Sequence, residues 1–241
     1  MRVPGSLLVL VVLFSIQAGA QDVDKLPEHP TVPAVRFECV WEAATPQDFV
    51  VVVNSLGSAK YLSRNPTRQN EDGSNSLDLS DYNIDFTLSP ANQTRVFQLA
   101  LQANYFNGDF EYKKHAVAST GTKTLGYADS SRHFETTYNW SENTAIDQLT
   151  SIFEGISSTL EHGRRLSFLR RFDKLGLEDE LKGMEDAAEK HYLAEIQAIA
   201  PILENIAADS SVLNIARRRA RRLLDLAGKE AGQHAGVKTP Q

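Results

Sequence analysis

The period of the hydrophobic pattern changes once along this chain, and that change restricts the folds open to it. Up to residue 138, apolar and polar residues tend to alternate, so that a segment such as 82–88 places its large apolar side chains on one face. From Ser141 onward, apolar residues recur every three or four positions, as they do in amphipathic helices. This order predicts an α+β fold, in which an antiparallel β-sheet has helices packed on one face and is followed by an α-helical C-terminal region.

The predicted strands are short segments bounded by turn-forming residues. They cover residues 35–42, 48–53, 59–63, 82–88, 123–127 and 132–138. Asn54-Ser55-Leu56-Gly57 predicts a hairpin turn between the second and third strands, and the polar stretch 65–76 predicts a loop.

Ser89-Pro90 is the strongest local signal for a helix start. Serine accepts a hydrogen bond at the N-cap, and proline fits the first turn, where its missing N–H would be unpaired anyway. We expect this helix to continue to about Asn107 and to end at Gly108.

Glycine, proline and an Asp-Ser-Ser turn divide the C-terminal region into helices. The expected helices cover Ser141 to about Gly163, residues 166–175 up to Gly176, residues 181–208, and residues 212–227. Pro201 removes a backbone hydrogen bond, which predicts a kink or a new helix start near Ala200. Residues 196–227 are similar to a single HEAT-type helical hairpin.

The first twenty residues have the pattern of a secretory signal peptide. Arg2 is followed by the apolar run LLVLVVLFSI, and Ala18-Gly19-Ala20 supplies the small residues that a signal peptidase reads. A membrane anchor is the alternative, but a membrane span needs about 20 apolar residues. We predict cleavage after Ala20, a secreted or periplasmic protein, and no transmembrane segment once the signal is removed.

Composition divides the chain into five parts. They are a signal peptide at 1–20, a flexible leader at 21–34, an α+β domain at 35–162, an α-helical region at 163–227 and a disordered tail at 228–241. Residues 21–162 carry 10 Lys and Arg against 19 Asp and Glu, a net charge of −9, and residues 163–241 carry 14 against 12, a net charge of +2. The overall acidity of an exported chain disfavours nucleic acid as a partner.

Cys39 is the only cysteine, so an internal disulfide is excluded. Its alternating surroundings favour a buried structural thiol. A catalytic nucleophile and a disulfide-linked dimer remain the alternatives.

The sequence lacks the short motifs of common enzyme and cofactor sites: GxSxG, the P-loop, GxGxxG after a strand, and HExxH. The histidines are far apart in the sequence: His29, His115, His133, His162, His191 and His234. An acidic cluster in and after the polar loop lacks EF-hand spacing: Glu71, Asp72, Asp78, Asp81 and Asp85. We therefore predict no catalytic residue, no cofactor and no metal.

The most unusual segment is a run of five arginines within six helical residues: Arg217, Arg218, Arg219, Arg221 and Arg222. One hypothesis is an anionic-partner site, in which these side chains bind an acidic exported protein or an anionic surface such as lipid headgroups. The favoured interpretation is pairing within the protein, either with acidic residues of 178–189 or with the acidic N-terminal region.

Residues 48–162 show a hairpin, the Ser89-Pro90 helix, a strand pair around Leu125 and Phe134–Tyr138, and a helix starting near Asn143. This segment resembles small uncharacterised modules of exported bacterial proteins and the emfourin type of metalloprotease inhibitor. The resemblance implies a compact sheet-and-helix binding module and assigns no functional residue.

Together these observations predict a non-enzymatic module that binds a macromolecule, with a peptidase as one candidate partner. The alternative is a hydrolase whose site is assembled only in three dimensions. A deep pocket that gathers His115 or His133 with two carboxylates favours the enzyme, whereas a shallow surface with an exposed apolar patch favours the binding module.

Overall fold

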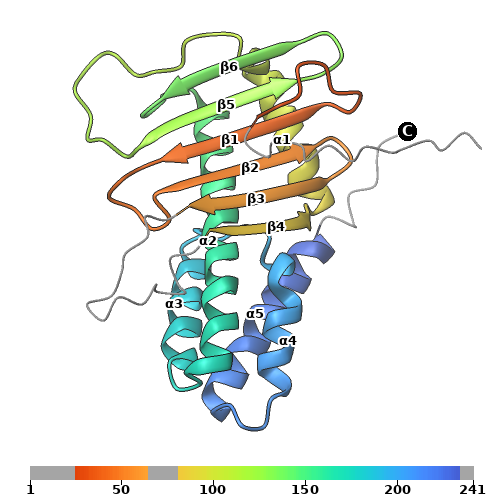
Figure 1. Ribbon diagram of the computed structural model, residues 1–241, viewed down its shortest axis with the longest axis vertical. Coiled ribbons are helices and arrows are strands. Elements are labelled where there is room, and N and C mark those ends of the chain that lie inside the picture. Colours follow the sequence, from red (N-terminus) through yellow and green to blue (C-terminus); the bar gives the residue numbers. More distant parts are fainter. Residues whose placement is uncertain (1–24, 65–80, 234–241) are drawn as a thin grey trace, which may run out of the picture.

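The computed structural model describes residues 25–64 and 81–233, and its fold is of the predicted α+β class (Figure 1). The predicted signal peptide, the first residues of the leader, the predicted loop 65–76 and the end of the predicted tail lie outside the described residues.

The six predicted strands form one antiparallel sheet in the order β4-β3-β2-β1-β5-β6. Their bounds are β1 (Ala34–Val40), β2 (Asp48–Asn54), β3 (Ser58–Arg64), β4 (Tyr82–Thr87), β5 (Thr122–Ala128) and β6 (His133–Tyr138). β1 is central because Phe37 lies opposite Val51 of β2 on one side and Leu125 of β5 on the other. This register places the alternating apolar residues of neighbouring strands on the same face.

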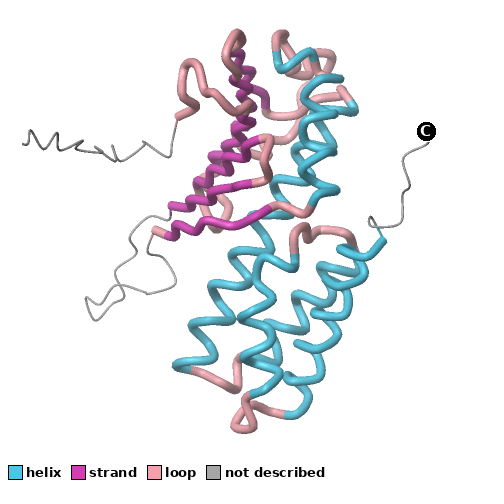
Figure 2. The backbone as a smooth tube through the Cα atoms, turned by 90° about the vertical axis from the view of Figure 1, so that its right-hand side faces the viewer, coloured by secondary structure: helices cyan, strands magenta, loops and turns pink. Residues whose placement is uncertain are grey.

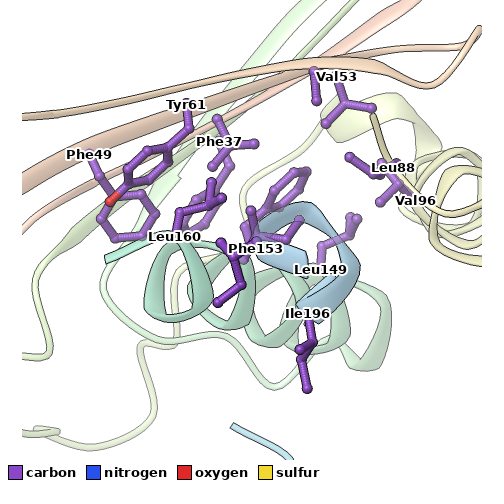
Figure 3. Packing of buried hydrophobic residues seen from close by; sticks show 14 of the residues in the cluster. Phe37, Phe49, Val53, Tyr61, Leu88, Val96, Leu149, Phe153, Leu160 and Ile196 are labelled. Carbon is purple, nitrogen blue, oxygen red and sulfur yellow. The ribbon is translucent and has the colours of Figure 1, made fainter. Parts of the chain in front are cut away.

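Two helices, α1 (Pro90–Gln102) and α2 (Thr144–Phe172), cover one face of the sheet (Figure 2). The core lies between these layers, where Phe37 stacks on Phe153 of α2 with ring centroids 5.2 Å apart (Figure 3). Leu149 and Leu160 extend this contact along the same side of α2, and both side chains are fully buried. The apolar side chains that recur about every 3.6 residues along α2 therefore pack against those that recur every two residues along the strands.

The Ser89 cap of α1 is confirmed, since the Ser89 hydroxyl accepts a hydrogen bond from the Asn92 N–H at 3.3 Å. The expected end near Asn107 is wrong, because α1 ends at Gln102 and a 3₁₀ turn follows over Asn104–Phe106. All three residues of this turn have positive φ. The turn buries Phe106 completely, and that burial favours leaving the helix early.

The expected helix end near Gly163 is also wrong, because α2 continues through it to Phe172. Gly163 is the point where α2 crosses the chain near Ile199, and a Cβ atom there would lie 2.5 Å from Ile199 Cγ2. The glycine therefore permits a close approach of two segments. The proposed boundary between residues 162 and 163 consequently falls inside α2, whose C-terminal half extends past β4 into the helical region (Figure 1).

The helical region consists of the end of α2 with α3 (Leu177–Glu189), α4 (Ala200–Ala208) and α5 (Asn214–Gln233). The new helix start near Ala200 is confirmed, with Pro201 in the first turn of α4. The continuous stretch expected from residue 181 is wrong, because α3 ends at Glu189 and the chain leaves the helix before a 3₁₀ turn at Ile196–Ile199. α4 and α5 pack as a helical hairpin.

The expected end of the last helix at Ala227 is wrong as well, since α5 continues to Gln233. The buried face of α5 includes Leu223 and Ala227, whereas Gly228 and Lys229 just after them are helical but exposed. The helix start is two residues later than Val212, because Asp209–Leu213 form the turn between α4 and α5.

A buried carboxylate joins the helical region to the N-terminus of α1. Glu195 accepts hydrogen bonds from the Ser89 N–H at 2.7 Å and the Ser89 hydroxyl at 2.8 Å. It also accepts from Asn92 Nδ2 at 2.6 Å and from Gln197 Nε2. A carboxylate is favoured there by the partial positive charge of a helix N-terminus.

Candidate functional site

An open groove lies on the face of the sheet away from α2. We call it the outer groove; its volume is about 780 Å³. One wall is the leader, and the floor comes from β2, β3 and β4: Lys25, Leu26, Pro27, Pro30, Val32, Ala34, Val52, Asn54, Ser58, Ala59, Lys60, Asp85, Phe86 and Thr87.

The leader is attached to the sheet by an apolar contact. Leu26 is buried against Ala34 and Ala128, and Val52 packs on the same small cluster. The predicted flexible leader therefore has a defined course from Lys25 onward. Most of the groove lining is apolar, and its charged groups include Lys60 and Asp85, whose ion pair measures 3.8 Å and is solvent-exposed. The arrangement suits contact with an apolar segment of a partner.

A second candidate site lies where β1 and β6 end and β5 begins, at the left of the sheet in Figure 1. Two hollows of about 410 and 190 Å³ adjoin there, because both are lined by Thr120 and Glu154. Trp41 lines the larger hollow and Trp140 the smaller one. We call the combined site the tryptophan cleft.

Both indoles are held by rigid neighbours. Gly121 has φ +92° and lies so close to Trp41 that a Cβ atom would come within 2.7 Å of the Trp41 Cβ. Trp140 packs edge-on against Tyr112 with ring centroids 4.7 Å apart. About 40% of each residue stays exposed, 39% for Trp41 and 41% for Trp140.

Cys39 lies at the inner end of the larger hollow, beside Lys123 and Glu154. Lys123 is buried and donates hydrogen bonds to the Thr120 carbonyl at 2.9 Å and the Asn139 carbonyl at 3.1 Å. Its Nζ lies 3.9 Å from Glu154 Oε1. Burial raises the pKa of the Cys39 thiol to about 11 in spite of Lys123. The thiol is therefore protonated at neutral pH, and its burial fits the structural interpretation better than a nucleophile or an intermolecular disulfide.

Glu154 is the carboxylate that lines both hollows. Desolvation by the surrounding protein raises its pKa, and the Lys123 ammonium partly offsets that effect. Its side chain is about half exposed and faces both hollows. The group can accept hydrogen bonds from a ligand in the cleft.

A row of buried polar side chains on α2 continues from the cleft toward β3. The Tyr61 hydroxyl lies 2.9 Å from Ser157 Oγ and donates to Glu161 Oε1 at 2.9 Å. Ser63 Oγ donates to the same carboxylate oxygen at 2.6 Å. Sequence reasoning missed this network because Glu161 lies at the end of an apolar stripe and resembles a solvated helix residue. Each polar group is satisfied inside the core, so the network holds α2 in register on the sheet.

The arginine run lies on α5, where most of its members have partners within the protein. Arg219 pairs with Glu178 at 3.1 Å and with Glu185, and Arg222 pairs with Glu185 at 2.7 Å. Burial alone would raise the pKa of the Glu185 carboxyl, but the hydrogen bonds from Arg222 and Arg219 lower it overall.

The other three arginines of the run differ in their environment. Arg217 and Arg221 each donate to the Ala207 carbonyl at 3.2 Å, which satisfies a backbone acceptor at the end of α4. Arg218 is exposed. The candidate anionic-partner site is thus dispersed, with four of its guanidinium groups directed to acceptors on α3 or α4 and the fifth, that of Arg218, exposed to solvent.

The histidines do not gather around a described hollow. His115 and His133 are exposed and line neither the outer groove nor the tryptophan cleft. His162 is 2.6 Å from Glu180 between α2 and α3. Within residues 25–64 and 81–233, no group of three or more His, Cys, Asp or Glu side chains is placed to hold a metal ion. Of the acidic cluster, only Asp81 and Asp85 belong to the described part of the chain.

None of the helices in the described part of the chain has the length and apolar character needed to cross a membrane. No protein-family model matches the sequence, and no curated protein matches it either. Function must therefore be argued from the sites themselves.

Proposed function

We propose that this chain is an exported, non-enzymatic module that binds another protein through the outer groove. The observation that carries the proposal is the groove itself, because it is open, has a volume of about 780 Å³ and is lined mainly by apolar side chains. A peptidase is the first partner class to test, since residues 48–162 resemble emfourin-type inhibitors.

The occupant that fits best is an extended segment of the partner. The groove runs between the leader and the ends of β2, β3 and β4, with prolines and aliphatic side chains on the leader side. Apolar side chains of the occupant would be removed from water there, at roughly 25 cal/mol for each Å² buried. The exposed pair of Lys60 and Asp85 offers a polar contact in the groove floor.

A hydrolase is the second candidate, and the tryptophan cleft is the place where it would act. Glu154 with its raised pKa is a possible acid–base group there. The protonated Cys39 thiol and the distance of His115 and His133 from the cleft lining weigh against nucleophilic catalysis.

The test fills the groove without disturbing the core. Thr87 is exposed, lines the groove and lies opposite Ser58, so Thr87→Trp should occupy the hollow. Thr137→Trp is the matched control, because Thr137 is exposed on β6 at the far side of the sheet and does not line the groove.

The wild type and both variants would be immobilised and exposed to purified secreted metallopeptidases, with binding followed by biolayer interferometry and inhibition followed by casein hydrolysis. We expect the wild type and Thr137→Trp to bind equally and Thr87→Trp to lose at least tenfold in affinity, about 1.4 kcal/mol. Equal binding by all three proteins would exclude the outer groove as the binding site for the peptidase. Casein hydrolysis by this protein alone would favour the hydrolase.

A further inference from the structure

The tryptophan cleft contains a combination of groups that the outer groove lacks. Two half-exposed indoles lie in the walls of adjoining hollows, and the accessible Glu154 carboxylate belongs to both hollows. We propose that this cleft binds a neutral saccharide chain. The inference is independent of the protein partner proposed for the outer groove.

A saccharide fits because its rings are amphipathic in the same way as the lining. A pyranose ring presents C–H groups on its faces and hydroxyl groups at its edge. The indole faces of Trp41 and Trp140 suit the C–H surfaces, since aromatic side chains work well where one side of a ligand is apolar and the other is wet. The Glu154 carboxylate and the Ser158 hydroxyl suit the ring edges, because they can accept hydrogen bonds from hydroxyl groups.

The length of the cleft favours a chain over a single ring. The helix α2 lines both hollows with polar side chains from Asp147 to Ser158. A helix rises 1.5 Å per residue, so this lining extends over about 16 Å. Several linked rings can lie along that distance, with the two indoles contacting different rings.

The charge of the cleft favours a neutral ligand over an anionic one. Asp147 and Glu154 are carboxylates of the lining, whereas the buried Lys123 ammonium is held by backbone carbonyls and by Glu154. Arg165 is engaged by Glu180 at 2.8 Å. A polyanion would therefore meet the exposed carboxylates of Asp147 and Glu154 with no free cation of the lining to bind it.

The tryptophan cleft is also preorganised, because its backbone is ordered without a ligand. The Trp41 backbone is fixed by the close approach of Gly121 and by the hydrogen bond from the Trp41 backbone N–H to the Gln47 carbonyl at 2.7 Å. The Trp140 carbonyl accepts from the Tyr112 N–H at 2.9 Å. A site whose backbone is already ordered loses less conformational entropy on binding, which strengthens binding for a given set of contacts.

The experiment uses the fact that Trp41 and Trp140 are the only tryptophans in the chain, so intrinsic tryptophan fluorescence reports on this cleft alone. The mature protein, residues 21–241, would be titrated with cellohexaose, chitohexaose and maltohexaose. Each would be taken to about 10 mM, above the millimolar dissociation constants of weak complexes. We expect at least one hexasaccharide to give a saturable change in emission.

Single substitutions then locate the site. Trp41→Ala, Trp140→Ala and Glu154→Ala should each weaken binding at least about tenfold, as for central aromatic and charged contacts. Phe172→Ala is the matched control and should bind normally, because Phe172 is an exposed aromatic residue at the far end of α2. Trp41→Phe should recover part of the loss of Trp41→Ala, and thermal unfolding would verify that each variant is folded.

Three outcomes would overturn the proposal. One is the absence of any emission change with all three hexasaccharides. Another is undiminished binding, measured by calorimetry, in both folded tryptophan-to-alanine variants. The third is saturable binding of an oligolysine peptide with no binding of the saccharides, which would assign the cleft to a basic peptide.

Discussion

Replacing Gly163 by alanine tests the close crossing between α2 and the segment around Ile199. Alanine stabilises a helix interior by about 0.8–1 kcal/mol relative to glycine. Its Cβ atom, however, would lie 2.5 Å from Ile199 Cγ2 and 3.2 Å from Ile199 Cβ. Overpacking of this kind destabilises a core by about 1–3 kcal/mol. We therefore expect Gly163→Ala to lower the free energy of unfolding by up to about 2 kcal/mol in net terms.

Gly183 provides the matched control, because it lies in the interior of α3 and a Cβ atom there would meet nothing within 4 Å. Gly183→Ala should raise the free energy of unfolding by about 1 kcal/mol. Urea unfolding followed by circular dichroism measures both, and the two midpoints should differ by about 1 M in urea. In an Ile199→Ala background, Gly163→Ala should become neutral or stabilising. Equal stabilisation by Gly163→Ala and Gly183→Ala in the wild-type background would refute the reasoning.

The other predictions concern a cap, an ion pair and a thiol. Ser89→Ala should lower the free energy of unfolding by about 2 kcal/mol, because it removes a helix cap and a hydrogen bond to the buried Glu195 carboxylate; unchanged urea midpoints would contradict this. Arg219→Gln should lower it by about 1 kcal/mol, less in high salt, because the Arg219 side chain is only 16% exposed between two glutamates. Arg218→Gln on the exposed face should leave the free energy of unfolding unchanged. An equal loss of stability in Arg218→Gln and Arg219→Gln would point to a general charge effect. Alkylation of Cys39 by iodoacetamide at pH 8 should be at least about 100-fold slower in the folded protein than in urea, since its pKa is raised from 9.0 to about 11. The folded-state rate should rise tenfold per pH unit below that pKa, and labelling at the same rate in both states would show an accessible thiol.

The strands were predictable because each carries its own local signal. The run of valines in β2 and the turn at Asn54–Gly57 both predict structure from neighbouring residues alone. Helix ends were less predictable, because their causes are distant in the sequence. Gly163 looks like a helix end until Ile199 is placed against it, and the early end of α1 depends on the burial of Phe106.

The candidate sites follow the same rule. The arginine run is visible in the sequence, but the glutamates that pair with Arg219 are 34 and 41 residues away. The tryptophan cleft has no local motif, since Trp41 and Trp140 follow strands that are separated by β5 in the sheet. The one available hint was the position of Trp41 near the end of the predicted strand 35–42 and of Trp140 just after the predicted strand 132–138, and only the strand order brings them to the same end of the sheet.

The helix α2 joins the two ends of one continuous core, since its first half packs under the sheet and its second half packs with α3, α4 and α5. Neither half of the molecule can lose its structure without removing the support of a helix that the other half needs. The chain should therefore unfold in one cooperative transition, with matching calorimetric and van't Hoff enthalpies, instead of behaving as two independent domains. A fragment ending at residue 162 would retain the sheet but divide this helix, so the shortest autonomously folding unit includes both the sheet and the helices after it.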